Sequence, residues 1–249
     1  MNKYNKLFSA LLLLAILISN LECEQKKEKP KEYFVNKLKD SLTIDANLNK
    51  PEWKNITGLT IKNILGKTPK YTPKTEVKML YDDNYIYAIF HVNEKYIKAV
   101  ATKINDYVYR DSGVEFFFTP SNNISDGYFN LEINCIGTPY FKHQIKFKKN
   151  VIDIDTNDIK KIEIAHSLSG IINSEIEKTI DWTLEFKIPI NMIKKYAKVI
   201  QPAAGVVWRA NFYKTADATS NPHYLSWNKI KSKKPNFHLP VFFGIIKFN

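Results

Sequence analysis

The sequence predicts an all-β protein, a single jelly-roll-like antiparallel β-sandwich with one short helix. Three observations predict this fold: polar and apolar residues alternate in many short segments, turn-forming residues separate these segments, and helical periodicity is confined to one stretch. Alternation with a period of two puts one face of a strand against a core. Many such strands at regular spacing are typical of sandwiches and barrels, and not of parallel α/β sheets.

A hairpin gives the clearest strand signal. Residues 75–81 alternate, residues 82–84 (Asp-Asp-Asn) suit a tight turn, and residues 85–92 (YIYAIFHV) return as a mostly apolar strand. Because the turn joins the two segments directly, they are expected to pair as neighbours in one sheet.

A second pair of strands is predicted at residues 114–119 and 128–135, joined by the polar loop 120–127. Residues 140–149 also alternate strictly, with lysines expected on the face opposite the aromatic residues. The one expected helix covers residues 191–199, where apolar side chains recur on a single helical face after a proline. Further strands are expected at residues 161–166, 182–188, 206–213 and 241–248.

The N-terminal 22 residues have the pattern of a signal peptide. Two lysines precede the apolar run 7–18, which is about a dozen residues long and too short to span a bilayer. Cys23 follows at the distance where bacterial lipoproteins are cleaved and acylated, although Asn-Leu-Glu precedes it in place of small residues. A plain secretory signal is the alternative. We expect an exported lipoprotein of the bacterial cell envelope, facing the periplasm or the cell surface.

A charged tether and one folded domain are expected after the signal peptide. Residues 23–32 are rich in lysine and glutamate and carry no apolar period, so they cannot bury surface. The domain then covers residues 33–249. Cys135 is its only cysteine, so no disulfide can form inside it and its stability must come from the core.

The formal net charge of +12 raises the question of a polyanionic partner. The lysines are spread along the whole chain, and no known nucleic-acid motif is present. We therefore expect no nucleic-acid partner, and contact with a membrane only through the lipid anchor.

Seven segments, in order along the chain, resemble the carbohydrate-binding modules of family 9 and their relatives, the DOMON-like β-sandwiches. The segments are 42–53 (LTIDANLNKPEW), 77–92 (VKMLYDDNYIYAIFHV), 109–118 (YRDSGVEFFF), 128–137 (YFNLEINCIG), 182–189 (WTLEFKIP), 208–213 (WRANFY) and 224–248, with YLSW, FHLP and FG. The resemblance covers nearly the whole domain. It implies a sandwich that binds a saccharide or glycan, often at a chain end, between two aromatic rings.

The resemblance also implies which residues form the site. Tyr109, six residues before Glu115, corresponds to the first ring, and the Glu115 carboxylate would accept hydrogen bonds from sugar hydroxyls. Phe237 is the nearest match to the second ring, with Trp227 as the alternative. Asn211 corresponds to a polar side chain of the family's late strand.

One position departs from the family pattern. Asn130 stands near the place where sugar-binding members carry an arginine, so Arg110 or Arg209 would have to supply the missing donor. Asn134 and Glu132 either line the site or cap the end of their strand.

Several of these residues also have a purely structural interpretation. Tyr109 and Phe237 could equally be ordinary surface aromatics, and Glu115 could fix a loop. His91 and His238 are expected to be structural, and five aromatic residues are assigned to the core: Trp53, Trp182, Trp208, Phe116 and Phe118.

Other functions are less well supported by the sequence. A glycoside hydrolase would use two carboxylates such as Glu115 and Glu132, but no nucleophile elbow or zinc-protease motif is present, and catalysis is not expected. A haem-binding DOMON-like domain would need axial ligands such as Met79 and His91, which no haem-specific spacing supports. A surface adhesin for host glycans would differ in ligand and not in binding mode.

No cofactor is predicted. Residues 45–49 begin like a calcium loop, but Lys50 stands where the loop needs glycine and Ile56 where it needs glutamate. A structural calcium elsewhere in the sandwich stays open, without a clear motif to support it.

Overall fold

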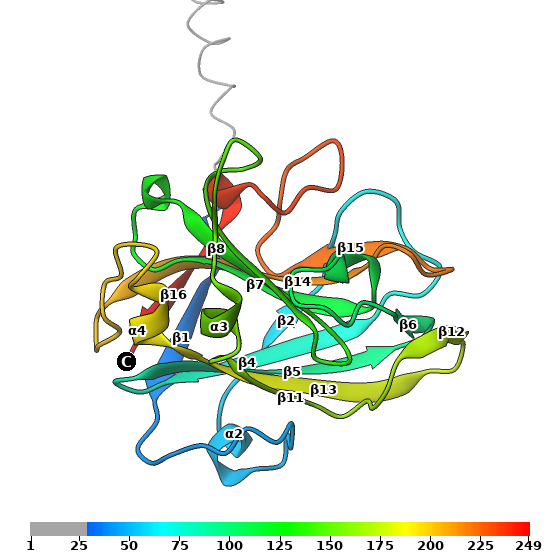
Figure 1. Cartoon of the computed structure of the whole chain (residues 1–249), viewed down its shortest axis with the longest axis horizontal. Coiled ribbons are helices and arrows are strands. Elements are labelled where there is room, and N and C mark those ends of the chain that lie inside the picture. The colour runs from blue at the N-terminus through cyan, green and yellow to red at the C-terminus, as the bar shows by residue number, and fades with distance from the viewer. Residues whose placement is uncertain (1–28) are drawn as a thin grey trace, which may run out of the picture.

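The computed structural model describes residues 29–249, and one sheet curls into two facing layers (Figure 1). The predicted signal peptide, Cys23 and most of the tether lie outside the described residues. The upper layer contains, in spatial order, β10 (Asn150–Asp153), β9 (Pro139–Lys146), β8 (Tyr128–Asn134), β7 (Gly113–Thr119), β14 (Val207–Ala216) and β16 (Gly244–Phe248). The lower layer contains β4 (Lys74–Tyr81), β5 (Tyr85–Glu94), β13 (Ile180–Pro189) and β11 (Glu163–His166).

The N-terminal strand joins the two layers. β1 (Glu32–Lys37) pairs in parallel first with β16 and then, through Asn36 and Lys37, with β4. The described strand pairs that do not involve β1 are antiparallel, so the all-β sandwich prediction is confirmed with this one parallel connection added. β1 was not predicted, and it begins at Glu32, one residue before the expected start of the domain.

The strongest strand predictions are confirmed, and the remaining differences have local causes. The predicted hairpin forms β4 and β5, and the second predicted pair forms β7 and β8. The strand expected over 140–149 ends at Lys146, because Lys148 adopts a left-handed conformation (φ 58°) in a turn that leads back into β10. The last strand begins only at Gly244, after a single 3₁₀ turn, η3 (Pro240–Phe242).

The sequence-based prediction missed several short strands. These are β2 (Leu59–Ile61), β3 (Asn63–Ile64), β6 (Ile97–Ala99), β12 (Ile172–Ile176) and β15 (His223–Ser226). Residues 29–249 contain three four-residue α-helices where one longer helix was expected: α2 (Pro51–Lys54), α3 (Thr156–Ile159) and α4 (Ile190–Ile193). The predicted helix over 191–199 was therefore wrong in length, since α4 gives way to turns after its first four residues.

Aromatic side chains fill the space between the layers. Phe116 stacks on Phe118 (ring centroids 4.5 Å apart) and on Phe212 (4.9 Å), and Trp182 and Trp208 are fully buried. Trp53 is also buried, but it lies beneath the lower layer with α2. The five aromatic residues assigned to the core are all buried, as predicted.

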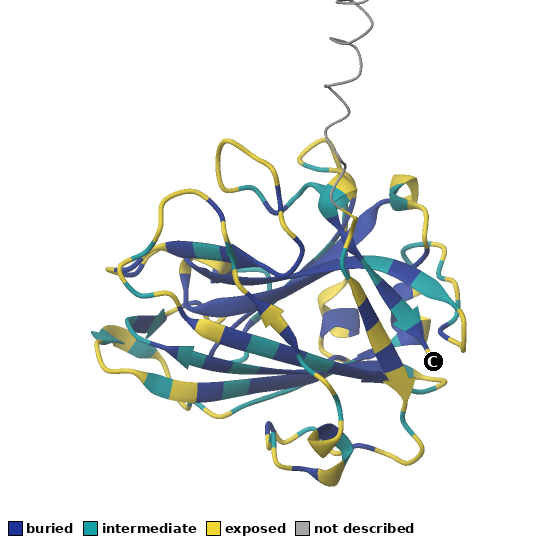
Figure 2. Cartoon of the chain, turned by 180° about the vertical axis from the view of Figure 1, so that it is seen from behind, coloured by how far each residue is buried: buried dark blue, intermediate teal, exposed yellow. Residues whose placement is uncertain are grey.

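The upper layer is covered on both faces. Every residue of β7 and β8 is buried, whereas buried and exposed positions alternate along much of β1 (Figure 2). Their inner residues face the aromatic core, and part of their outer face packs against residues 227–243, which supply a second apolar cluster. Polar side chains of β7 and β8 therefore lie on a face that is partly shielded from water.

Candidate binding site

An open cleft of about 700 Å³ lies on the outer face of the upper layer. The strands beneath the cleft contribute polar side chains to its lining: Glu115 from β7, Glu132 from β8 and Gln144 from β9. Six tyrosine and phenylalanine side chains also line the cleft: Tyr107, Tyr109, Tyr140, Phe147, Tyr224 and Phe237. The cleft thus combines ring faces with buried oxygen acceptors.

The loop that leads into β7 carries the two most exposed tyrosines among residues 29–249. Tyr109 lies in the 3₁₀ turn η1 (Val108–Arg110), and its carbonyl oxygen accepts hydrogen bonds from Thr215 Oγ1 (3.3 Å) and from the Asp217 amide (3.4 Å). Tyr107 packs edge-on against the Tyr109 ring, with centroids 6.1 Å apart. The Tyr109 and Tyr107 side chains are 43% and 66% exposed, so their rings are accessible from solvent.

The aspartate that follows η1 anchors this loop through hydrogen bonds. Asp111 Oδ2 accepts hydrogen bonds from the Ala101 amide (2.9 Å) and from Asn134 Nδ2 (2.9 Å). The backbone of Ser112 is held in turn by the carbonyl oxygen of Lys98 (2.8 Å). Because both ends of the loop are tied to strands, the two tyrosines are held in place on rigid support.

The opposite wall comes from the segment that covers the upper layer. Phe237 stacks on Tyr213 (4.1 Å, rings 10° apart) and meets Tyr224 edge to face (6.2 Å). His238 Nδ1 forms a hydrogen bond with the Tyr128 hydroxyl (2.9 Å), and its ring stacks on that of Phe147 (centroids 3.7 Å apart). Burial, and then the charge of Lys148, lowers the pKa of His238 to about 3, so it is a neutral wall residue at pH 7, in keeping with the structural role expected for it.

Two carboxylates face each other across adjacent strands. Glu115 and Glu132 are directly opposite partners in the β7–β8 ladder and are only 3% and 6% exposed. Burial raises the pKa of Glu132 to about 7, against the opposing effect of its hydrogen bond from Asn130 Nδ2 (3.0 Å). Burial and the neighbouring Glu132 charge raise the pKa of Glu115 well above its usual range, and Lys214 opposes this only in part.

The structure brings three of the predicted site residues into this cleft. Tyr109, Glu115 and Phe237 all line it. Glu132, which was expected either to line the site or to cap its strand, also lines the cleft. Their roles toward a ligand stay predictions.

Four other predicted residues lie outside the cleft, and the polar side chains of three of them are in structural contacts. Asn134 bonds Ala101, Asp111 and Thr138, and Asn211 exchanges hydrogen bonds with the backbone of Asn228 (2.8 and 3.0 Å). Arg209 donates to the carbonyl oxygens of Phe243 and Gly244. Trp227 is buried against Phe212, and a Cβ on Gly244 would come within 2.4 Å of its ring. The chain positions of these residues suggested a site, but residues 227–243 cover Asn211 and Arg209, and Asn134 is held by the backbone and side chains of the loops beside it.

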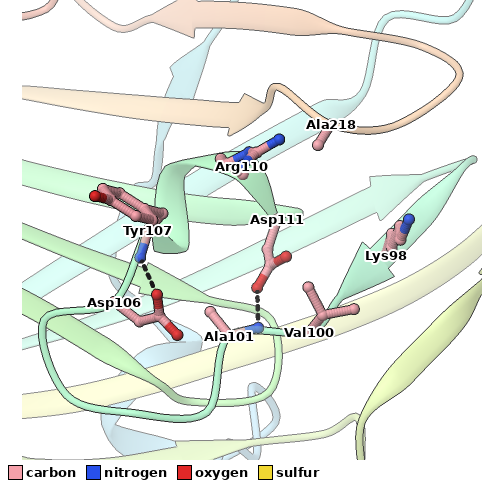
Figure 3. A pocket seen from close by; sticks show the side chains of 8 residues that line it. All are labelled: Lys98, Val100, Ala101, Asp106, Tyr107, Arg110, Asp111 and Ala218. Atoms are coloured by element: carbon pink, nitrogen blue, oxygen red, sulfur yellow. Dashed lines mark hydrogen bonds between the residues drawn. The ribbon is translucent and has the colours of Figure 1, made fainter.

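Arg110 lies on a different hollow. It lines a smaller pocket of about 280 Å³ beside the cleft, together with Lys98, Asp106 and Asp111 (Figure 3). Tyr107 lines both hollows. Neither arginine proposed as the missing donor therefore lines the main cleft.

Sequence reasoning missed several residues that line the cleft. Tyr140 is the direct partner of Glu132 in the β8–β9 ladder, so correct pairing of the two predicted strands would have found it. Tyr224 is carried by the short strand β15, which pairs with β14. Tyr107 precedes Tyr109 by two residues. The alternation over 140–149 placed Phe147 on one face with Phe141, but Phe147 lies beyond the end of β9 and lines the cleft instead.

The suggested haem ligands point to opposite faces of the lower layer. Met79 belongs to the core between the layers, whereas His91 points outward and bonds Asp181 (3.0 Å). The two side chains cannot ligate one iron. Among residues 29–249, no group of three or more histidine, cysteine, aspartate or glutamate side chains is placed to hold a metal ion.

Comparison with known proteins gives one family match. The profile of carbohydrate-binding family 9 matches residues 45–248. No curated protein sequence matches significantly.

Solved structures with the same fold include a candidate carbohydrate-binding protein from Bacteroides uniformis ATCC 8492. It is 26% identical, with a TM-score of 0.79 over 89% of this chain and 100% of that one. A carbohydrate-binding module of family 9 from Caldicellulosiruptor kristjanssonii, in complex with cellotriose, has a TM-score of 0.60 at 16% identity, over 88% of this chain and 93% of that one. Its complex with glucose gives 0.61 at 16% identity, over 88% and 96%.

Proposed function

The chain belongs to carbohydrate-binding family 9, and from this premise we propose that it is a non-catalytic module that binds saccharides in the cleft beside Tyr109. The observation that carries the proposal is the pairing of six aromatic side chains with buried acceptors in one open cleft. Flat rings cover the apolar faces of pyranose rings, and carboxylate and amide oxygens accept hydrogen bonds from sugar hydroxyls. Cellotriose and glucose, which are bound in the structures of the Caldicellulosiruptor module, are suitable first probes.

Catalysis is disfavoured by the arrangement of the two carboxylates. A glycosidase uses one carboxylic acid and one carboxylate that flank the scissile bond, with pKa values set apart by different surroundings. Glu115 and Glu132 instead lie side by side on adjacent strands of one sheet face, and burial raises the pKa of both. Incubation with oligosaccharides, followed by product analysis, should give no hydrolysis.

Removal of the exposed rings tests the binding site. Tyr107→Ala and Tyr109→Ala should each weaken saccharide binding by about tenfold, because each deletes a stacking surface of an accessible ring. Isothermal titration calorimetry with cellotriose and a wider glycan screen would measure this. Phe34→Ala is a matched control, because Phe34 is a similarly exposed aromatic residue (54%) on β1. Saccharide binding that survives both tyrosine variants would show that the ligand lies elsewhere.

We also propose that the protein is an exported lipoprotein held at the cell envelope by a lipid on Cys23. The pattern of the N-terminal sequence supports this, with charged residues 24–32 as a spacer before the folded domain. Among residues 29–249, no helix is both long and apolar enough to cross a membrane.

Loss of the acylated cysteine tests the anchor. Cys23→Ser should move the protein from the membrane fraction to the soluble exported fraction, and mass spectrometry of the wild-type N-terminus should find a lipid-modified Cys23. An unmodified cysteine in the wild-type protein would support the plain secretory signal.

A further inference from the structure

The polar floor of the cleft has more hydrogen-bond acceptors than the protein supplies donors for. Within residues 29–249, no group donates a hydrogen bond to the Glu115 carboxylate, although its side chain is almost fully buried. Glu132 receives one, from Asn130 Nδ2. Gln144, which is 3% exposed and lines the same cleft, has a buried Oε1 atom without a partner. Buried polar atoms are normally hydrogen-bonded, so this floor is suited to a ligand that supplies several donors.

Neither Glu115 nor Glu132 forms an ion pair with any described residue. Lys214 lies on β14 but points to the core, where its ammonium contacts Glu94 Oε1 (2.8 Å) and the Thr215 carbonyl oxygen (2.8 Å). His238 is neutral, so it contributes no positive charge at pH 7.

The lysines of the cleft lie on its rim and not at its floor. Lys148 and Lys234 are both exposed, and the Lys148 ammonium lies over the Phe147 ring (5.1 Å to the centroid). Charges that face solvent are screened by water and salt, whereas buried charges are screened much less. The buried glutamates should therefore decide which ligand charge the cleft favours.

We propose that the cleft selects saccharides with a free amino group, of the glucosamine type, whose ammonium lies between Glu115 and Glu132. This inference rests on the proposed saccharide-binding function and names its substrate class. An ammonium has three donors and one positive charge, so it can bond both carboxylates at once and remove the repulsion between them. A hydroxyl can bond a carboxylate but leaves its charge in place. A metal ion is a poorer occupant, because none of residues 29–249 places a third acidic or histidine ligand beside the pair.

Matched trisaccharides test this selectivity. Calorimetry on the purified full chain at pH 7 would compare a β-1,4-linked glucosamine trimer, its fully N-acetylated form and cellotriose, which has a neutral hydroxyl in place of the amine. The aminated trimer should bind about tenfold tighter than cellotriose, since hydrogen bonds to charged groups contribute more than neutral ones. Glu132→Gln and Glu115→Gln should each reduce that ratio toward one, with smaller changes in cellotriose affinity.

Lowering the pH supplies a second readout. From pH 7 to pH 5 the sugar amine gains protons while the two carboxylates lose the rest of their charge, so the preference for the aminated trimer should disappear. His238, which lines the same cleft, stays neutral over this range because burial lowers its pKa to about 3.

The outcomes separate the two proposals. Cellotriose binding with equal or weaker binding of the aminated trimer would overturn the amine selectivity and leave the saccharide site intact. An amine preference that survives both glutamine variants would also overturn it, and so would tighter binding of a uronic-acid trimer, which would assign selectivity to the rim lysines. Absence of binding to every saccharide by the folded protein would instead refute the proposed function.

Discussion

Replacing Glu185 with alanine is expected to lower the free energy of unfolding by about 3–5 kcal/mol, because it breaks a buried ion pair and leaves several buried donors without their acceptor. Glu185 is fully buried on β13, and its carboxylate contacts the Lys50 ammonium (2.7 and 2.8 Å) and Trp53 Nε1 (2.7 Å). It also accepts hydrogen bonds from the backbone amides of Asp45 (2.9 Å) and Ala46 (2.8 Å). One side chain thus holds residues 45–53 against the lower layer.

Urea denaturation would measure this loss, and two variants make it interpretable. Glu185→Gln keeps the shape and one acceptor oxygen, so it should cost less than the alanine variant. The double variant Glu185→Leu with Lys50→Met removes both charges of the pair and should cost less than the loss of the glutamate alone, since the ammonium is then no longer buried beside a missing partner. A single-variant loss below about 1 kcal/mol would contradict the assigned role.

The same cluster explains why the calcium-like sequence does not form a calcium loop. Asp45 Oδ1 lies 2.8 Å from the Lys50 ammonium, which also contacts the carbonyl oxygen of Thr43 and the Glu185 carboxylate. An internal ammonium therefore occupies the place among these oxygens that a metal ion would take. The sequence showed that the motif fails at Lys50, but it could not show that Glu185, 135 residues away, completes the cluster.

Local patterns predicted much of the sandwich because strands depend on alternation and on turns close in sequence. The hairpin around Asp82 could be predicted this way: Asp82 Oδ1 accepts the amide hydrogens of Asn84 and Tyr85 (both 2.7 Å) and so builds the turn from neighbouring residues. β1 could not be predicted from local patterns, because it is ordered by parallel pairing with β16, a strand more than 200 residues away.

The site was predictable only where the family pattern is local. Tyr109 and Glu115 share one quoted segment and both line the cleft. Asn211 and Arg209 were chosen from a matching strand, but burial of that strand depends on residues 227–243, whose path over the sheet has no local signature. Tyr140 reaches the cleft through strand register, which alternation alone does not set.

Replacing Glu132 with glutamine is expected to stabilise the unliganded protein at pH 8 by about 3 kcal/mol. Burial raises the pKa of Glu132 from 4.5 to about 7, so the folded state disfavours the charged carboxylate. One pKa unit corresponds to about 1.4 kcal/mol, which sets this magnitude. The contribution of the glutamate to stability is fully present below about pH 4.5 and is lost as the pH rises to about 7. The glutamine side chain has no such loss.

The difference between the two unfolding free energies isolates this effect. It should be small at pH 4, grow between about pH 4.5 and 7, and stay constant above that, whatever the buried histidines contribute to both proteins. Glu177→Gln changes the net charge by the same amount at an exposed position, and its difference from the wild type should vary much less with pH. A Glu132→Gln variant that is less stable than the wild type at pH 8 would contradict the assigned environment of the pair.

Stabilisation by Glu132→Gln would also indicate the role of the glutamate pair. A residue whose charge destabilises the free fold above pH 7, but which can be replaced by a neutral isostere of the same size, has no stabilising reason to be a glutamate. If an aminated saccharide occupies the cleft, it should raise the unfolding free energy of the wild type more than that of Glu132→Gln, because only the wild type recovers the energy of its buried charge on binding. Stabilisation of both proteins to the same extent would mean that the ligand gives the two carboxylates no ionic partner, and that Glu132 contributes nothing to recognition.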